Sequence, residues 1–485
     1  MQSSPQPHTS SNKWLAMLGL GLGVFLATLS TSIVNLSLPT LTREFNTNFA
    51  TIQWVILSFS LVLTALLLSV ARLGDMRDKK QIYLAGLIFF TLSSLLCGLA
   101  PGVGWLIGLR ALQGLGAAMM QALGMAMITE IFPLKERGRA IGVMGSVVSL
   151  GVALGPPLGG ALIGLAGWRS IFFINLPVGI VTALVVWRFV PSSPPGRSGQ
   201  RFDLAGALTL LITLGSYALG MTYIQTQGFR SPMALSLLVL AAVGLTLLIF
   251  IESRVKQPMI ALKLFLNPLF GINLLMGMLV FVVLSASIIL PFILELVWGY
   301  PAPQAGLILM SMPLAMGVIA PAAGLLADRF GTYLISILGL LVLIGGCLWM
   351  GTMRPDTSLV GFLLRLVVLG VGVGLFQSPN NSAIMGAAPR MHLGMASGLL
   401  SLSRALGQSS GLSLMGAVFT ASVLMTASGS SRADIIAAPS AALVVGVNVT
   451  YRFGAALIAA GLGATLLGLV NARSRLGFPR KSHPD

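Results

Sequence analysis

Five charged side chains stand inside or at the edges of long apolar runs. The basic ones are Arg110, Arg365 and Arg404, and the acidic ones are Glu130 and Glu295. A charge at the centre of a bilayer costs about 2.5–3.5 kcal/mol on insertion scales, so it is expected to face a cavity or a partner. An arginine keeps its proton and can hold an anionic group, whereas a carboxylate can carry a proton. This set indicates the movement of protons or charged solutes.

Composition places the chain in a membrane. Of its 485 residues 56% are hydrophobic and 8% are charged, whereas charged residues make up about a quarter of a soluble domain. The net charge of +17 could suggest nucleic acid binding, but most Lys and Arg residues fall in alternate loops between apolar runs. That distribution is typical of cytoplasmic loops, so the charge reports topology and argues against a nucleic acid partner.

Runs of about 20 apolar residues can cross the bilayer, and fourteen can be marked off. We place them near 14–38, 51–71, 82–100, 104–128, 140–165, 170–190, 203–222, 232–252, 268–294, 304–326, 332–350, 358–378, 394–422 and 450–471. An even number puts both termini on one side. The basic residues at both ends of the chain predict that this side is cytoplasmic.

The chain also repeats itself about 256 residues apart. Six residues of the first copy recur in order and spacing in the second: Gly138, Ala140, Gly142, Leu150, Gly151 and Gly155 match Gly394, Ala396, Gly398, Leu406, Gly407 and Gly411. Two homologous membrane halves are typical of secondary transporters. The predicted all-α organisation is a tail (1–13), six helices (14–190), linkers with two inserted helices (191–267), six helices (268–472) and a basic tail (473–485).

Features of an enzyme are missing from the sequence. The three histidines fall in predicted loops or tails, and no phosphate-binding glycine loop or metal-ligand cluster occurs. Cys97 and Cys347 lie in apolar helices and are interpreted as packing residues. We therefore expect no catalytic residue, no metal and no cofactor, and ATP is disfavoured as the energy source.

Two related loops carry an acid beside basic residues. Their residues are Asp75, Lys79 and Lys80 after the second span, and Asp328 and Arg329 in the second half. An acid at a helix end beside cations can form a charge latch between halves, which breaks as the protein changes state. A solvated loop that only sets topology is the alternative.

The fifth span contains the segment GVALGPPLGG at 151–160. Gly151, Gly155 and Gly159 line one helix face, with Gly160 beside them, so another helix can approach closely. Pro156 and Pro157 remove backbone donors and are expected to bend the helix. Leu412 and Ser413 stand at the matching positions of the second copy. A plain tight-packing site is the alternative to a special role.

These motifs resemble the major facilitator superfamily, and within it the fourteen-span drug/proton antiporters of the EmrB/QacA type. The resemblance covers nearly the whole chain. It implies that 71–80 is the family's loop motif, although two glycines and an arginine of the pattern differ. It also implies that 151–160 is the antiporter signature, a seal against leak, and that Arg110 takes part in proton transfer. Arg365 and Arg404 are candidate second-half counterparts, and Arg365 could instead snorkel or bind free carbonyls.

The first span departs from the family pattern, because Ser30 stands where relatives usually carry an Asp. An intramembrane carboxylate is the natural proton carrier. We expect Glu295 or Glu130 to replace it, with Glu295 preferred because it lies toward the outer side. An ordinary helix-end charge is the alternative for both.

Uncharged polar side chains complete the predicted substrate cavity. Together with Ser30 and Arg404 they are Thr31, Asn35, Gln113, Gln121, Asn273, Gln377 and Asn381. The sequence predicts an exporter of amphipathic small molecules in the cytoplasmic (inner) membrane, driven by proton antiport. The excess of embedded arginines favours neutral or anionic solutes. A dedicated exporter of one metabolite, lipid or siderophore, or an uncoupled facilitator, is the alternative, and a periplasmic adaptor is an open question.

Overall fold

The computed structural model describes residues 10–192, 204–228, 230–254, 264–265, 267–387, 393–426 and 438–475. The three histidines and most of both predicted linkers lie outside these residues. Every regular element is helical in the described part. The first-half helices are α1 (Ser10–Glu44), α2 (Phe49–Ile52), α3 (Trp54–Met76), α4 (Lys79–Gly98), α5 (Val103–Ile131), α6 (Leu134–Ala166), α7 (Ser170–Phe173) and α8 (Asn175–Phe189).

The remaining helices follow after residue 203. They are α9 (Leu204–Gln227), α10 (Pro232–Arg254), α11 (Pro268–Leu284), η2 (Ser285–Ile289), α12 (Leu290–Phe292), η3 (Ile293–Val297), α13 (Ala302–Leu309), α14 (Ser311–Phe330), α15 (Thr332–Met350), α16 (Leu359–Ala387), α17 (Leu393–Thr426) and α18 (Ser440–Arg475). Short segments such as η2, α12 and η3 continue one path through the membrane, so elements outnumber spans.

Thirteen helical stretches of the described residues are long and apolar enough to cross a membrane, and Leu208–Ile224 of α9 is a shorter apolar stretch. A bundle of about 13–14 apolar helices agrees with the predicted membrane protein. One predicted bound was wrong, because the last span begins at Ser440 and not near 450. The ninth span lies close to its predicted position, at Pro268–Val297, but after Leu284 it consists of 3-10, α and π turns.

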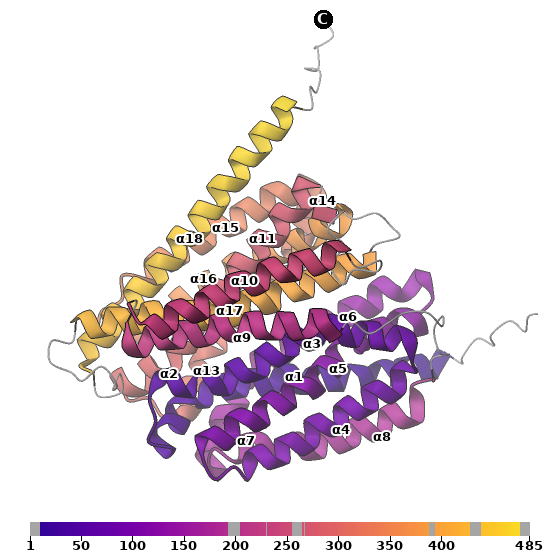
Figure 1. Ribbon diagram of the computed structural model, residues 1–485, viewed down its shortest axis with the longest axis horizontal. Coiled ribbons are helices and arrows are strands. Elements are labelled where there is room, and N and C mark those ends of the chain that lie inside the picture. The colour runs from indigo at the N-terminus through magenta and orange to yellow at the C-terminus, as the bar shows by residue number, and fades with distance from the viewer. Residues whose placement is uncertain are drawn as a thin grey trace, which may run out of the picture.

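Helices of the two halves pack in the same pattern. In the first half α1 packs on α6 and α8, α5 packs on α3 and α4, and α4 packs on α8. In the second half α11 packs on α17 and α18, α16 packs on α14 and α15, and α15 packs on α18. Figure 1 shows the first-half helices in the lower part of the view and most second-half helices above them. α9 crosses between them and packs on both α3 and α17.

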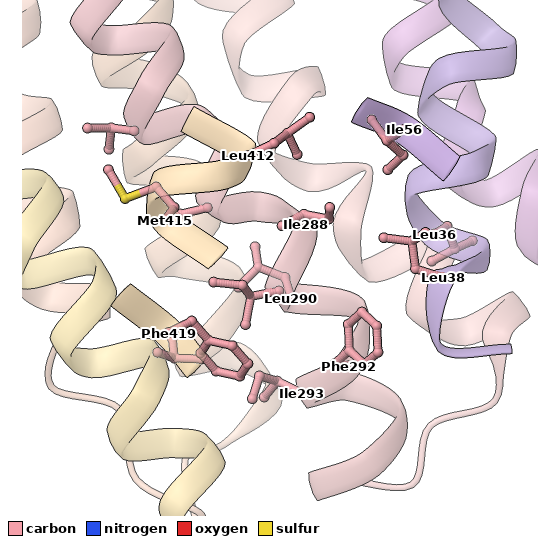
Figure 2. Close-up of a cluster of buried hydrophobic side chains, with 14 of the residues drawn as sticks. Leu36, Leu38, Ile56, Ile288, Leu290, Phe292, Ile293, Leu412, Met415 and Phe419 are labelled. Atoms are coloured by element: carbon pink, nitrogen blue, oxygen red, sulfur yellow. The ribbon is translucent and has the colours of Figure 1, made fainter. Parts of the chain in front are cut away.

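We call the end of the bundle formed by 45–53, 167–170, 298–301 and 351–358 the outer end, following the predicted topology. The inner end contains 77–78, 132–133 and 331. Near the outer end, buried side chains of both halves form one apolar cluster, which we call the outer seal (Figure 2). Its members are Leu36, Leu38, Ile56, Ile288, Leu290, Phe292, Ile293, Leu412, Met415 and Phe419. Phe49 extends it, because its ring meets Phe292 and Phe419 edge-on at 5.0 and 5.5 Å between centroids.

Candidate transport site and gate

Arg110 is fully buried within the first half. Its Nε donates to the Val55 carbonyl at 3.0 Å, and its Nη1 donates to Oε1 of Gln113 at 2.6 Å. The guanidinium also stacks over the Phe59 ring at 4.3 Å, an arrangement that favours a cation. Nη2 of Arg110 has no hydrogen-bond partner among the described residues. The charge is thus stabilised by neutral groups in a water-poor part of the bundle.

Ser30 lies directly beside this arginine. Nη1 of Arg110 donates to the Ser30 hydroxyl at 3.4 Å, so the position where the fourteen-span pattern has an acid faces the buried cation. A carboxylate there would pair with Arg110, whereas a hydroxyl leaves the positive charge uncompensated. The sequence pointed to both residues, and the structure brings them together.

Arg404 is the second arginine well inside a span. It belongs to α17, is half-buried, and donates through Nη2 to Oδ1 of Asn381 on α16 at 2.7 Å. The Phe281 ring of α11 lies 5.7 Å from its guanidinium carbon. The structure therefore joins two residues that the sequence placed separately in the predicted cavity.

Arg365 is different, because it lies near the outer end of α16. Its Nε donates to the Trp349 carbonyl at 3.1 Å and its Nη1 donates to the Gly361 carbonyl at 2.8 Å, while the guanidinium stacks on the Trp349 ring. These contacts hold the end of α15 against α16. They favour the second of the two interpretations left open by the sequence, an arginine that binds backbone carbonyls.

The remaining predicted cavity residues are spread over several helices. Thr31 donates to the carbonyl of Ala27 at 3.0 Å, and Asn273 donates to that of Leu269 at 2.8 Å, so both bond within their own helices. Oδ1 of Asn35 is buried without a hydrogen-bond partner among the described residues. Gln121 and Gln377 are half-buried.

The glycine face of α6 packs directly on α1. A Cβ at Gly155 would collide with Ser32, and one at Gly159 would press against Ile33 at 3.0 Å. α6 is one helix from Leu134 to Ala166 and includes both prolines. Pro156 has no N–H for the carbonyl four residues earlier, that of Val152, and the Ser32 hydroxyl donates to this carbonyl at 2.9 Å.

The second half repeats this contact. The Ser285 hydroxyl donates to the Gln408 carbonyl at 3.1 Å, and a Cβ at Gly411 would press on the Ser285 hydroxyl at 2.7 Å. Gln408 lies 256 residues after Val152, so the sequence repeat extends to a hydrogen bond between equivalent helices. Leu412, however, keeps the backbone N–H that Pro156 lacks.

The same helix α6 also reaches the other half. A Cβ at Gly160 would collide with the Ala302 carbonyl of α13, and one at Gly306 would collide with the Pro156 carbonyl. Backbones of the two halves therefore touch where the glycines allow it. Gly306 was missed by the sequence analysis, because its role depends on a distant helix that crosses at this point.

An ion pair crosses the halves beside this contact. Nη2 of Arg43, at the end of α1, lies 3.3 Å from Oε2 of Glu295 in η3. The Arg43 side chain is 50% exposed and that of Glu295 only 4%, and Oε1 of Glu295 is buried without a hydrogen-bond partner among the described residues. Arg43 was not among the predicted site residues. The signal that could have found it is that a nearly buried acid at a span end needs a cation at a neighbouring span end.

Predicted latch residues lie at the inner end. Lys79 pairs with Glu130 of the same half at 2.8 Å, and the Glu130 side chain is about half exposed. Nζ of Lys80 donates to the Trp187 carbonyl, also within the first half. Asp328 and Arg329 are exposed, and the side chain of Asp75 lies outside what the structure describes. Asp78 instead caps α4 by accepting from the Lys80 amide at 3.0 Å.

Comparisons with known proteins agree on the family. A family model described as Major Facilitator Superfamily matches residues 20–412. The multidrug resistance protein Stp of Mycobacterium tuberculosis is 34% identical over 84% of this chain and 76% of its own length. The riboflavin transporter RibZ of Clostridioides difficile is 32% identical over 94% of this chain and 97% of its own length. A crystal structure of a bacterial homologue of the human lysosomal transporter Spinster shares the fold, with a TM-score of 0.67 and 17% identity over 93% of this chain and 96% of that chain.

Proposed function

The chain belongs to the Major Facilitator Superfamily, and on that premise we propose that it exports amphipathic small molecules across the cytoplasmic membrane by proton antiport. Relatives named for multidrug resistance, such as Stp, support the substrate class. The protein is thus a multi-pass membrane transporter of a non-enzymatic family. We propose its substrate class, its coupling to protons and the membrane in which it lies.

The proposed architecture is two six-helix bundles with α9 and α10 inserted between them, as in the fourteen-span antiporters. Equivalent helix pairings in the two halves and the matched bonds of Ser32 and Ser285 support the duplication. The packing of α9 on both α3 and α17 supports its place as an inserted helix. Both termini are proposed to be cytoplasmic, from the basic loops and tails.

Alternating access is supported above all by the contacts between halves at the outer end. Three contacts cross between the halves here: the outer seal, the Gly160 and Gly306 crossing, and the Arg43–Glu295 pair. Together they join α1, α3 and α6 of the first half to η2–α13 and α17 of the second half. Such a set closes the path to the outside in this state. Rocking of the halves would separate the same surfaces and open the outer end while the inner end closes.

Glu295 is the proposed proton-binding residue. It pairs with a cation of the opposite half, so its charge state can act on the relative position of the halves. Once protonated, it loses the attraction to Arg43, and the outward-open state becomes more favourable. Glu130 pairs with Lys79 inside one half, so its charge acts less directly on the relative position of the two halves. A potential of 100 mV supplies about 2.3 kcal/mol for each proton that crosses.

The test is proton release from energised everted vesicles made from a host that lacks its own pumps. Neutral, anionic and cationic amphiphiles are added one at a time, with vesicles lacking the protein as the control. Proton release on addition of a compound supports antiport, and Glu295→Gln should abolish it while the protein stays in the membrane. Unchanged release in that variant would remove Glu295 from the coupling scheme.

A dedicated exporter of a single compound, or an uncoupled facilitator, is the second candidate. Ser30 in place of the usual acid favours it, and so does the similarity to a protein named as a riboflavin transporter. Vesicles that accumulate one compound of the panel without proton release would support this candidate over multidrug antiport.

A further inference from the structure

The three arginines inside the spans differ in how many of their donors are used. Arg110 is buried and bonds through Nε and Nη1, and Arg365 bonds backbone carbonyls. Arg404 donates to Asn381 alone among the described residues, although a guanidinium has five N–H donors. It is also half-buried, whereas Arg110 is fully enclosed. Arg404 is therefore the one best placed to bind a further group.

The positive charge of Arg404 has no acidic partner among the described ion pairs. Where the structure describes them, the ion pairs of acids near the membrane lie at helix ends: Glu44 with Arg169, Glu130 with Lys79, Glu136 with Lys13, and Glu295 with Arg43. Neither Arg404 nor Arg110 has an acidic partner among these pairs. The described interior of the bundle thus carries two positive charges well inside the spans, where weak screening strengthens attraction to an anion.

The neighbours of Arg404 suit an amphipathic ligand. Asn381 accepts from Arg404 through its oxygen, so its amide nitrogen remains as a second donor beside the cation. Gln377, one turn earlier on α16, is also half-buried, and the Phe281 ring supplies an apolar surface on the other side. Arg404 lies six residues after the apolar stretch of α17 begins at Gly398, which is about 9 Å along the helix from that inner end.

We propose that Arg404 and Asn381 bind the anionic group of the substrate, a carboxylate, sulfonate or phosphate on an apolar body, so that organic anions are the preferred substrate class. This assignment rests on the proposed export function. A closed outer end leaves the inner side as the route by which such an anion reaches Arg404. A lipid headgroup carries the same chemistry and is separated from a free solute by the test.

The test uses three probes with one ring system and different charges: 1-pyrenebutyrate, 1-pyrenebutanol and 1-pyrenebutylamine. Their uptake is measured in everted vesicles, and their binding is measured in nanodiscs of phosphatidylcholine with and without phosphatidylglycerol. The variants are Arg404→Gln, Arg404→Lys and Asn381→Asp. The last one keeps the arginine and the side-chain shape but supplies an internal carboxylate, so it competes with the ligand even if Arg404→Gln does not fold.

We expect the wild type to bind pyrenebutyrate at least ~10-fold more tightly than pyrenebutanol, because hydrogen bonds to a charged group are the stronger ones. Arg404→Gln and Asn381→Asp should lose this preference, and Arg404→Lys should keep part of it. Phosphatidylglycerol also repels the anionic probe from the membrane surface. A loss of pyrenebutyrate binding with phosphatidylglycerol that is larger in the wild type than in Arg404→Gln would therefore identify the lipid headgroup as a competing occupant of the same anion site.

Two results would overturn the inference. Uptake of the probes without preference for the carboxylate, or a preference that survives in both variants, refutes the anion site while leaving export intact. Failure of all three probes to bind or accumulate in folded wild-type protein refutes the export of amphiphiles itself, and the anion site with it.

Discussion

The two residues of the cross-half ion pair should differ in what their loss costs the outer-closed state. Arg43 is half exposed, so in Glu295→Gln the arginine regains water, and the cost is that of an exposed pair, about 1 kcal/mol or less. In Arg43→Gln the nearly buried Glu295 loses Arg43, the cation with which it pairs in the described structure. Removing one partner of a buried ion pair costs about 3–5 kcal/mol. We take about 3 kcal/mol, because the pair is open to water on one side.

This difference of about 2 kcal/mol predicts that the ratio of open to closed outer ends rises roughly 30-fold more in Arg43→Gln than in Glu295→Gln. The ratio can be measured by double electron–electron resonance between spin labels at Asn46 and Ser358. Both positions are exposed at the outer end, one in each half. Cys97 and Cys347 are buried and are replaced by alanine in the background.

The double variant Arg43→Gln/Glu295→Gln should return close to the value of Glu295→Gln, because position 295 then carries no charge. Arg169→Gln is the matched control: it breaks the pair with Glu44, whose members are 48% and 49% exposed and lie in the same half. It should leave the distance distribution unchanged. Equal shifts in the two single variants, or a larger one in Glu295→Gln, would refute the reasoning from burial.

Three further predictions follow from single contacts. External acidification should open the outer end in the wild type, because a protonated Glu295 no longer attracts Arg43, and the same labels should show no such change in Glu295→Gln. Ser32→Ala should lower the unfolding free energy by about 1–3 kcal/mol, because the Val152 carbonyl then accepts neither a helical nor a side-chain hydrogen bond. Ser285→Ala should lower it by less, since Leu412 of α17 keeps the backbone N–H that Pro156 lacks. Equal losses of stability in thermal unfolding would contradict this prediction. Ser30→Asp should place a carboxylate beside Arg110 with little change in thermal stability, since the attraction between the charges and the cost of desolvating the carboxylate largely cancel. It should also shift uptake of the pyrene probes from the anion toward the cation. An unchanged preference would show that this site does not set the charge of the interior.

Much of the fold could be predicted, because each membrane span can be recognised from its own hydropathy. A run of about 20 apolar residues needs no partner to be recognised, and the spacing of Gly151 and Gly155 recurs in Gly407 and Gly411. The turns after Leu284 in the ninth span were not predicted, because they depend on packing and not on hydropathy. The start of α18 is a different error, because the residues from Ser440 onward (SAALVVGVNV) are apolar and were wrongly assigned to the preceding loop.

The site was predictable as a set of residues but not as a set of contacts. Arg110 and Arg404 stand out because a charge in an apolar run is costly, wherever the helices lie. What each arginine binds depends on helices far away in the sequence: Ser30 approaches Arg110 across α1 and α5, and Asn381 approaches Arg404 across α16 and α17. No rule of sequence spacing predicts such pairs. The individual residues could therefore be identified from the sequence, but their contacts could not.

Ser30 shows why these contacts matter for function. In a chain with an acid at this position, the acid and Arg110 would neutralise each other, and the interior would keep only the charge of Arg404. Here the Ser30 hydroxyl accepts a long hydrogen bond from Arg110, at 3.4 Å, and does not cancel its charge. Compared with the fourteen-span antiporter pattern, Ser30 therefore changes two properties together: the proposed proton carrier is absent from this position, and the described interior is more positive. Both properties agree with the proposals that Glu295 binds the proton and that Arg404 binds an anionic substrate group.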